Sequence, residues 1–160
     1  MISLELSLKH LAWSNQKFFT YFGDMPDEVF GLKAAEGEWP VGQILTHIAG
    51  SGEWYQYCLG AGRWSDLKPI TSGIIALEYL PLMAKLDAVL YDNHLLPDAK
   101  LEIEGEDGII HATRSLIISQ AIMHSAEHKG QIAAIMKQYG HHIDLDSLDV
   151  WSYVSQTKNS

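Results

Sequence analysis

The sequence predicts an all-α protein whose long helices form a four-helix bundle, with a small β-hairpin before the last long helix. Three observations support this prediction. Apolar residues recur at the helical period of about 3.6 residues along most of the chain, and glycine and proline interrupt the pattern between these segments. The length of 160 residues is enough to bury a core without disulfides. We therefore expect residues 1–160 to form a single domain.

The first two helices have clear start and stop signals. Leucine and phenylalanine at helical spacing predict a helix over residues 4–22, which Gly23 and the nearby Pro26 should end. A short extra turn can begin at Pro26. Pro40 suits the first position of a second helix, which should run from about residue 41 to residue 59.

The second half of the chain should contain further helices with a hairpin between them. A helical segment spans about residues 72–94, and Pro81 either kinks it or marks its start, because proline lacks a backbone donor. Alternating apolar and acidic residues and an Asp-Gly turn pair predict a small hairpin or an extended loop at residues 100–112. The last long helix should cover residues 113–139, and the acidic tail after it should pack back on the body.

The composition limits the partners. The formal charge is −9, from 20 acidic and 11 basic residues, so phosphate backbones would be repelled and we expect no nucleic-acid partner. No apolar run approaches the roughly 20 residues that span a bilayer. The segment from Met1 to Leu6 lacks the features of a secretory signal, so we expect no membrane association and a cytoplasmic location. The single cysteine, Cys58, excludes a cysteine-rich zinc module and is expected to be a core thiol.

His124 and His128 are the strongest functional signal. Their i,i+4 spacing puts both imidazoles on one helix face, and apolar residues at the same spacing indicate that this face points toward the core. A buried imidazole needs partners for its ring nitrogens, and a divalent cation held by neutral histidines is one such partner. The alternative is a pair of core histidines satisfied by side chains or carbonyls, because His-x-x-x-His also arises by chance.

A catalytic divalent ion usually takes three protein ligands and keeps an open position. His47 is the best candidate for the third ligand, since it lies in the middle of the second helix beside Ile44 and Ile48. The remaining histidines lie near helix ends, in the hairpin region or after a helix-ending glycine, where histidines are more often solvated. They are His10, His94, His111, His141 and His142.

Glu127 gives the motif a second interpretation. The order His-x-x-Glu-His matches one class of zinc protease, in which the glutamate is the base that activates a water. The sequence offers no downstream carboxylate helix or substrate-binding strand to support a protease. A solvated carboxylate, or one that hydrogen-bonds a metal ligand, is the simpler interpretation of Glu127. Glu127 remains the candidate catalytic base.

The three histidines belong to a wider pattern that covers nearly the whole chain. Its elements are Trp39 with a mid-helix His47, His124-x-x-x-His128 followed by Lys-Gly-Gln-Ile, and an Asp-rich tail with Trp151 and Tyr153. This pattern resembles the DinB/YfiT-like family of metal-dependent enzymes. Members often have His-His-Arg-Gly-Gln at the second motif. Here Glu127 stands in place of the first of those histidines, whereas the histidine expected to bind metal is kept as His128.

The resemblance implies a four-helix bundle with a long crossover, often a homodimer, and a zinc, nickel or similar ion held by His47, His124 and His128. Characterised relatives include transferases and isomerases that use low-molecular-weight thiols such as bacillithiol or mycothiol. We therefore expect a metal-dependent enzyme that activates such a thiol, as an S-transferase acting on a small-molecule substrate. The alternatives are a hydrolase with Glu127 as base, and a non-enzymatic, stress-associated binding or scaffold protein.

Overall fold

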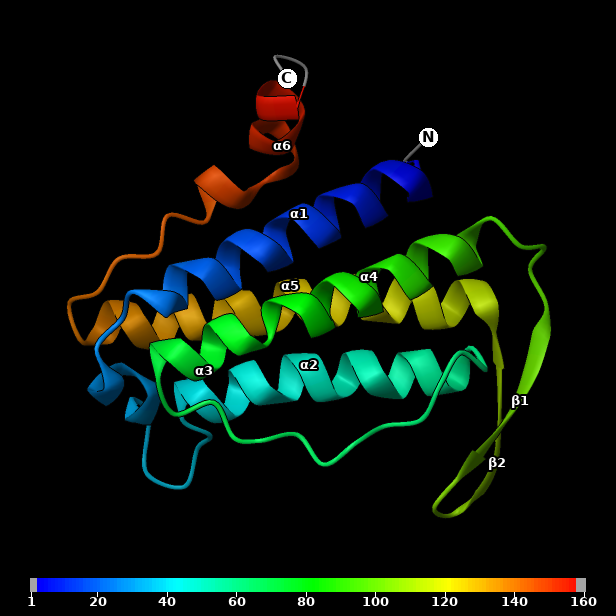
Figure 1. Cartoon of the computed structure of the whole chain (residues 1–160), viewed down its shortest axis with the longest axis horizontal. Helices are drawn as coiled ribbons and strands as arrows, with labels where there is room; N and C mark the ends of the chain where they lie inside the picture. The colour runs from blue at the N-terminus through cyan, green and yellow to red at the C-terminus, as the bar shows by residue number, and fades with distance from the viewer. Residues whose placement is uncertain (1–2, 158–160) are drawn as a thin grey trace.

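The computed structural model describes residues 3–157 (Figure 1). Residues 1–2 and 158–160, at the ends of the predicted domain, lie outside the described residues. The described chain is mostly helical, with a small antiparallel sheet of two strands. The long helices are α1 (Leu4–Gly23), α2 (Val41–Cys58), α4 (Leu80–His94) and α5 (Arg114–Gln138). The shorter elements are α3 (Gly73–Glu78), α6 (Val150–Thr157), and 3-10 turns at Asp27–Gly31 and Asp146–Leu148.

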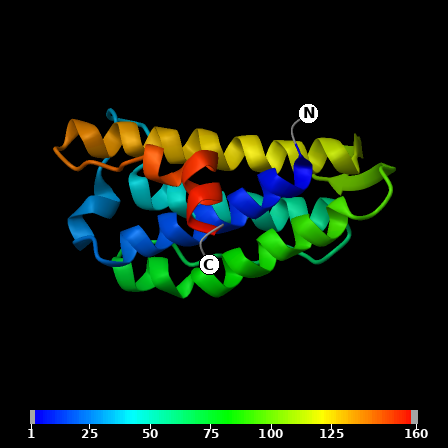
Figure 2. The same ribbon diagram turned by 90° about the horizontal axis from the view of Figure 1, so that it is seen from above.

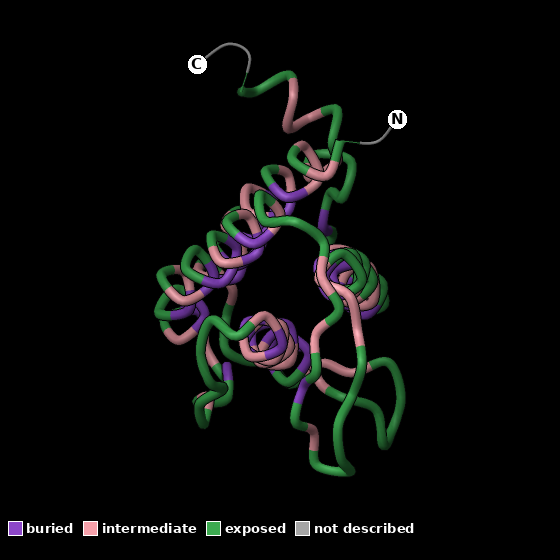
Figure 3. The backbone as a smooth tube through the Cα atoms, turned by 90° about the vertical axis from the view of Figure 1, so that its right-hand side faces the viewer, coloured by how far each residue is buried: buried purple, intermediate pink, exposed green. Residues whose placement is uncertain are grey.

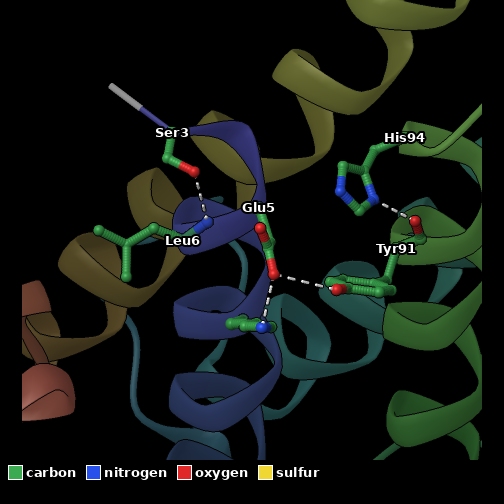
Figure 4. Close-up of polar contacts among 6 residues, drawn as sticks. Ser3, Glu5, Leu6, Tyr91 and His94 are labelled. Atoms are coloured by element: carbon green, nitrogen blue, oxygen red, sulfur yellow. Dashed lines mark hydrogen bonds and ion pairs between the residues drawn. The ribbon is translucent and has the colours of Figure 1, made fainter. Parts of the chain in front are cut away.

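The helix boundaries follow the local signals of the sequence. Ser3 caps α1 by accepting a hydrogen bond from the Leu6 amide, which is drawn in Figure 4. Thr113 caps α5 in the same way through the Leu116 amide. The segment around Pro81 consists of two helices that meet at Tyr79, and the proline lies in the first turn of α4, where no helical hydrogen bond is lost.

The long helices pack side by side around one interior. Helix α1 packs along α4, α2 packs along α5, and α2 also contacts α4. Figure 3 looks along the helices, and the buried stretches turn inward from each of them. The largest cluster of buried side chains includes Phe18, Phe22, Ile44, Ile132 and Met136. Burying each such side chain contributes roughly 1.5–3 kcal/mol, so the core fixes α2 and α5 relative to each other.

The two strands form a hairpin that projects from the helices beside the end of α2 (Figure 1). Strand β1 (Lys100–Gly105) pairs with β2 (Gly108–Thr113), from Lys100 opposite Thr113 to Gly105 opposite Gly108. Ile103 is the buried anchor of the hairpin and packs with Cys58 of α2 and Ile117 of α5. The predicted hairpin is therefore confirmed, and its tip stands free of the core.

The ends of the described chain are tied to the body by polar contacts. In Figure 4, Glu5 of α1 accepts hydrogen bonds from Lys9, at 2.6 Å, and from the Tyr91 hydroxyl of α4, at 3.3 Å. A His94 ring nitrogen bonds the Tyr91 carbonyl. Figure 2 shows α6 lying across α1, where His10 Nε2 is 2.7 Å from the Leu148 carbonyl oxygen. The tail therefore packs back on the body, as its sequence predicts.

Within residues 3–157, no helix combines the length and apolarity needed to cross a bilayer.

Candidate metal centre

The packing of α2 against α5 brings together the three histidines singled out by the sequence. His47 lies on α2, and His124 and His128 lie one turn apart on α5. His47 Nε2 is 3.1 Å from His124 Nε2, and His128 Nε2 is also 3.1 Å from His124 Nε2. One ring nitrogen from each residue lies within 4.8 Å of the other two. The three side chains are each half-buried.

Gln131 fixes the orientation of the His128 ring. Its amide oxygen, Oε1, lies 2.8 Å from His128 Nδ1. An amide oxygen only accepts hydrogen bonds, so Nδ1 donates its proton and Nε2 keeps a free lone pair. That lone pair points toward the other two imidazoles. Hydrogen bonding of the second ring nitrogen in this way is typical of metal-binding histidines.

The donor set fits a cation. A proton on one of the three Nε2 atoms can bridge one pair at a time, which leaves the remaining lone pairs facing each other at close range. In a tetrahedral zinc site with Zn–N bonds of about 2.0 Å, two ligand nitrogens are about 3.3 Å apart. The separations of 3.1 Å from His124 to its two neighbours are close to this value. A single ion would satisfy all three nitrogens.

The electrostatics favour neutral imidazoles. Burial, together with the neighbouring His128 and His47, lowers the pKa of His124 to about 4. Burial also lowers the pKa of His47, and His128 adds to the effect. Neutral rings keep the lone pairs that a metal requires, so these two histidines need not lose a proton near pH 7 to bind one.

A cavity of about 830 Å³ lies beside His47. Its side next to the histidines includes Trp39, whose ring packs edge-on against the His47 ring with centroids 4.9 Å apart. Ser51 also lines it, with Oγ 3.4 Å from His47 Nε2. A small molecule in this cavity would therefore reach the histidine cluster from the α2 side.

The other candidates from the sequence lie apart from this cluster. Glu127 is exposed, is absent from the cavity lining, and, among the described residues, has no hydrogen bond to the imidazoles. Its charge still acts on His124 as the weakest influence on that pKa. Cys58 is buried, and burial raises its pKa to about 11, as expected for a core thiol. His111 is exposed on the hairpin, 3.9 Å from Glu102.

Two features are not evident from the sequence motifs: the role of Gln131, and a buried polar network between α5 and α1. Gln131 follows His128 by three residues, and this helical spacing was a usable signal. In the network, Lys129 Nζ donates to Ser14 Oγ at 2.8 Å, and Ser125 Oγ donates to Asn15 Oδ1 at 2.9 Å. Asn15 Nδ2 in turn donates to Asp87 Oδ1 at 2.9 Å.

Burial perturbs the charged members of this network in opposite directions. It raises the pKa of Asp87 to about 6, opposed by the Asn15 hydrogen bond and by Lys129. It lowers the pKa of Lys129 to about 7, opposed by Asp87. No local sequence pattern predicts these contacts, because they join residues of α1, α4 and α5 that are far apart in the sequence.

Comparison with known protein families supports the resemblance drawn from the sequence motifs. The DinB family matches residues 1–151, which is nearly the whole chain. The chain therefore belongs to the DinB family. No curated protein matches it.

Proposed function

We propose that this DinB-family protein is a metal-dependent enzyme in which His47, His124 and His128 hold one divalent ion, with zinc and nickel as the first candidates. The observation that carries the proposal is the convergence of three Nε2 atoms from two helices. Three protein ligands leave one position of a tetrahedral shell for a small molecule. We also propose that α1, α2, α4 and α5 form the four-helix bundle with a long crossover that the resemblance implies.

The proposed reaction joins a low-molecular-weight thiol, such as bacillithiol or mycothiol, to a small electrophile. The thiol would lose its proton to solvent, its sulfur would form a bond to the electrophilic carbon, and the leaving group would depart from that carbon with the bonding electron pair. A divalent ion at the three histidines would favour the thiolate over the thiol. Gln131 would hold His128 in the binding tautomer, and Trp39 would limit the access of water to His47. The chain's own thiol, Cys58, is buried with a raised pKa, so it is a poor nucleophile. This supports an external thiol.

A hydrolase that uses Glu127 as general base is the alternative. The influence of the Glu127 charge on the pKa of His124 favours the hydrolase. The exposure of Glu127 and its absence from the cavity lining favour thiol transfer. Glu127→Gln separates the two proposals. Loss of amide or ester hydrolysis with metal retained would support the hydrolase, and unchanged thiol transfer in this variant would support the transferase.

Metal analysis of freshly purified protein tests the site itself. We expect about one divalent ion per chain in the wild type, and at least a tenfold loss in His47→Ala, His124→Ala and His128→Ala, because two remaining ligands hold an ion weakly. His111→Ala is the matched control, since its side chain is 72% exposed. Unchanged metal in all three variants would refute these ligands. A wild type that takes up no divalent ion would favour the scaffold alternative.

The predicted homodimer and the cytoplasmic location stay predictions. Light scattering on purified protein tests the first, and fractionation of the source cells tests the second.

A further inference from the structure

The cavity beside His47 extends well beyond the histidine cluster. Helix α2 forms its floor from Gln43 to Trp54. The eleven residue steps from Gln43 to Trp54 correspond to a helix rise of about 16 Å, so an elongated small molecule can lie along this floor. The loop segment 64–67 forms one wall, and the hairpin tip at residues 105–110 forms another.

The loop wall is held in place by hydrogen bonds to α2. The buried Glu53 carboxylate accepts from the Ser65 amide at 2.8 Å and from the Ser65 hydroxyl at 2.9 Å. Farther along, the Ile70 amide donates to Thr46 Oγ1 at 2.9 Å. These contacts fix Trp64 over the cavity, so the wall is formed before a ligand arrives.

The far end of the cavity is aromatic and apolar. Trp64 packs against Trp54 and Tyr57, with ring centroids 5.4 Å and 4.5 Å apart. Trp64 is nevertheless 51% exposed, and Ile109 across the cavity is 62% exposed. Large apolar side chains left open around a concave site are typical of a ligand-binding surface.

The charges in the lining are all negative. Glu53, Glu106 and Asp107 line the cavity, and no lysine or arginine is among its lining residues in the described chain. The nearest cations along the sequence are Arg63, which is exposed, and Lys68, which is 3.9 Å from Glu78. With a formal charge of −9 on the whole protein, this cavity disfavours anions.

We infer that the cavity binds a molecule with an apolar body and a cationic end, which lies between the tryptophans and the hairpin tip. This inference rests on the proposed function, because it names the electrophilic substrate class of the same site. Tryptophan faces attract cations, and Glu106 and Asp107 add an opposite charge nearby. His47 and Trp54 lie on the same face of α2, about 10 Å apart by helix rise. The reacting end would lie at His47, and the cation at the far end.

Binding of three matched probes to metal-free protein tests the inference. The probes are 4-phenylbutylamine, 4-phenylbutanol and 4-phenylbutyrate, which share one skeleton and differ in charge. Titrations followed by tryptophan fluorescence and calorimetry at pH 7 report affinity. We expect the amine to bind about three- to tenfold more tightly than the alcohol, from cation–π and charge attraction. The carboxylate should bind most weakly.

Two sets of variants locate the site. Trp64→Ala should weaken the affinity for the amine and for the alcohol alike, by about tenfold, since both ligands lose an aromatic contact. The double variant Glu106→Gln, Asp107→Asn should remove most of the amine's advantage and leave the alcohol unchanged. The controls are Trp151→Ala, on an 85% exposed residue of α6, and Asp27→Asn with Glu28→Gln, an exposed acidic pair elsewhere.

Several outcomes would overturn the inference. They are a carboxylate that binds as tightly as the amine, no saturable amine binding, or unchanged amine affinity in a folded Trp64→Ala variant. Thermal melting establishes that each variant is folded. Because the probes are tested without metal, binding that persists in His124→Ala supports the inference even if metal analysis refutes the proposed function. A metal-binding protein with no preference for the amine would refute the inference alone.

Discussion

Helix α5 carries two polar pairs at the same i,i+4 spacing, offset by one residue. His124 and His128 face α2, where their Nε2 atoms meet that of His47. Ser125 and Lys129 lie about 100° around the helix from them and face α1, where each bonds a side chain. In the second pair, hydrogens point at oxygens that accept them. In the first, nitrogens point at one another.

The difference between the histidine pair and the serine–lysine pair distinguishes a ligand site from a structural network. Buried polar groups in native proteins are normally hydrogen-bonded. The serine–lysine pair follows this rule, although Asp87 Oδ2, at the end of the same network, has no partner among the described residues. Three converging imidazole nitrogens can share a proton between only one pair at a time, so lone pairs remain that a cation could satisfy. The i,i+4 spacing alone does not distinguish a ligand site from a structural network, because both pairs have this spacing. We expect substitutions at the serine–lysine pair to affect stability and substitutions around the histidine pair to affect metal binding.

The largest expected effect is on stability, from Lys129→Met. This change removes the hydrogen bond from Lys129 Nζ to the buried Ser14 hydroxyl and the positive charge that favours the buried Asp87 carboxylate, and it should cost about 3 kcal/mol. Urea unfolding measures the loss. Lys85→Met, on an exposed position of α4, is the control and should change stability by less than about 0.5 kcal/mol.

Equal stabilities of Lys129→Met and Lys85→Met would show that the lysine is not part of a stabilising network. Metal content in Lys129→Met should match the wild type wherever the variant is folded.

The next effect is the pH dependence that Asp87 confers. Its pKa is raised from 3.8 to about 6 in the folded protein, so between these values the folded state binds more protons than the unfolded state. The Asp87 contribution to stability is therefore greatest below about pH 4 and is lost as pH rises to about 6. A shift of this size corresponds to about 3 kcal/mol.

Urea midpoints at several values between pH 4 and pH 7, for wild type and Asp87→Asn, measure this contribution as the difference between the two curves. A constant difference across that range would contradict a perturbed carboxylate.

A smaller effect belongs to the histidine face. Gln131→Ala removes the acceptor for His128 Nδ1 and should weaken metal affinity about 10- to 100-fold. Competition with a chromogenic chelator measures the affinity. Gln138→Ala, exposed in the last turn of the same helix, should leave it unchanged. Equal affinities in the two variants would mean that Gln131 does not orient the ligand.

The smallest effect compares one serine from each region. Ser125→Ala leaves the buried Asn15 Oδ1 without its donor and should cost about 1–2 kcal/mol. Ser51→Ala loses only a 3.4 Å contact to His47 in a half-buried position, and should cost less than about 0.5 kcal/mol. Equal losses in urea unfolding would remove the distinction between the two faces.

Local signals explain how far the sequence predicted this structure. Helix ends at Gly23, Thr113 and Pro81 depend on neighbouring residues, so the helices could be placed to within a residue or two. The three histidines could be identified because polar rings on an apolar stripe need a partner. His47 was identifiable only by its helix position, and its approach to α5 required the folded structure.

The other features depend on contacts between distant segments. The cavity joins α2 to the loop before α3 and to the hairpin tip, and the network of Lys129 joins three helices.

X-ray absorption spectroscopy at the metal edge of protein loaded with one equivalent of zinc observes the three-histidine ligand set itself. We predict three imidazole ligands with Zn–N distances of about 2.0–2.1 Å, together with one light-atom ligand from solvent. The His47→Ala protein should show two imidazoles under the same conditions. A wild-type spectrum with one imidazole or none, or a spectrum that the substitution does not change, would contradict the account.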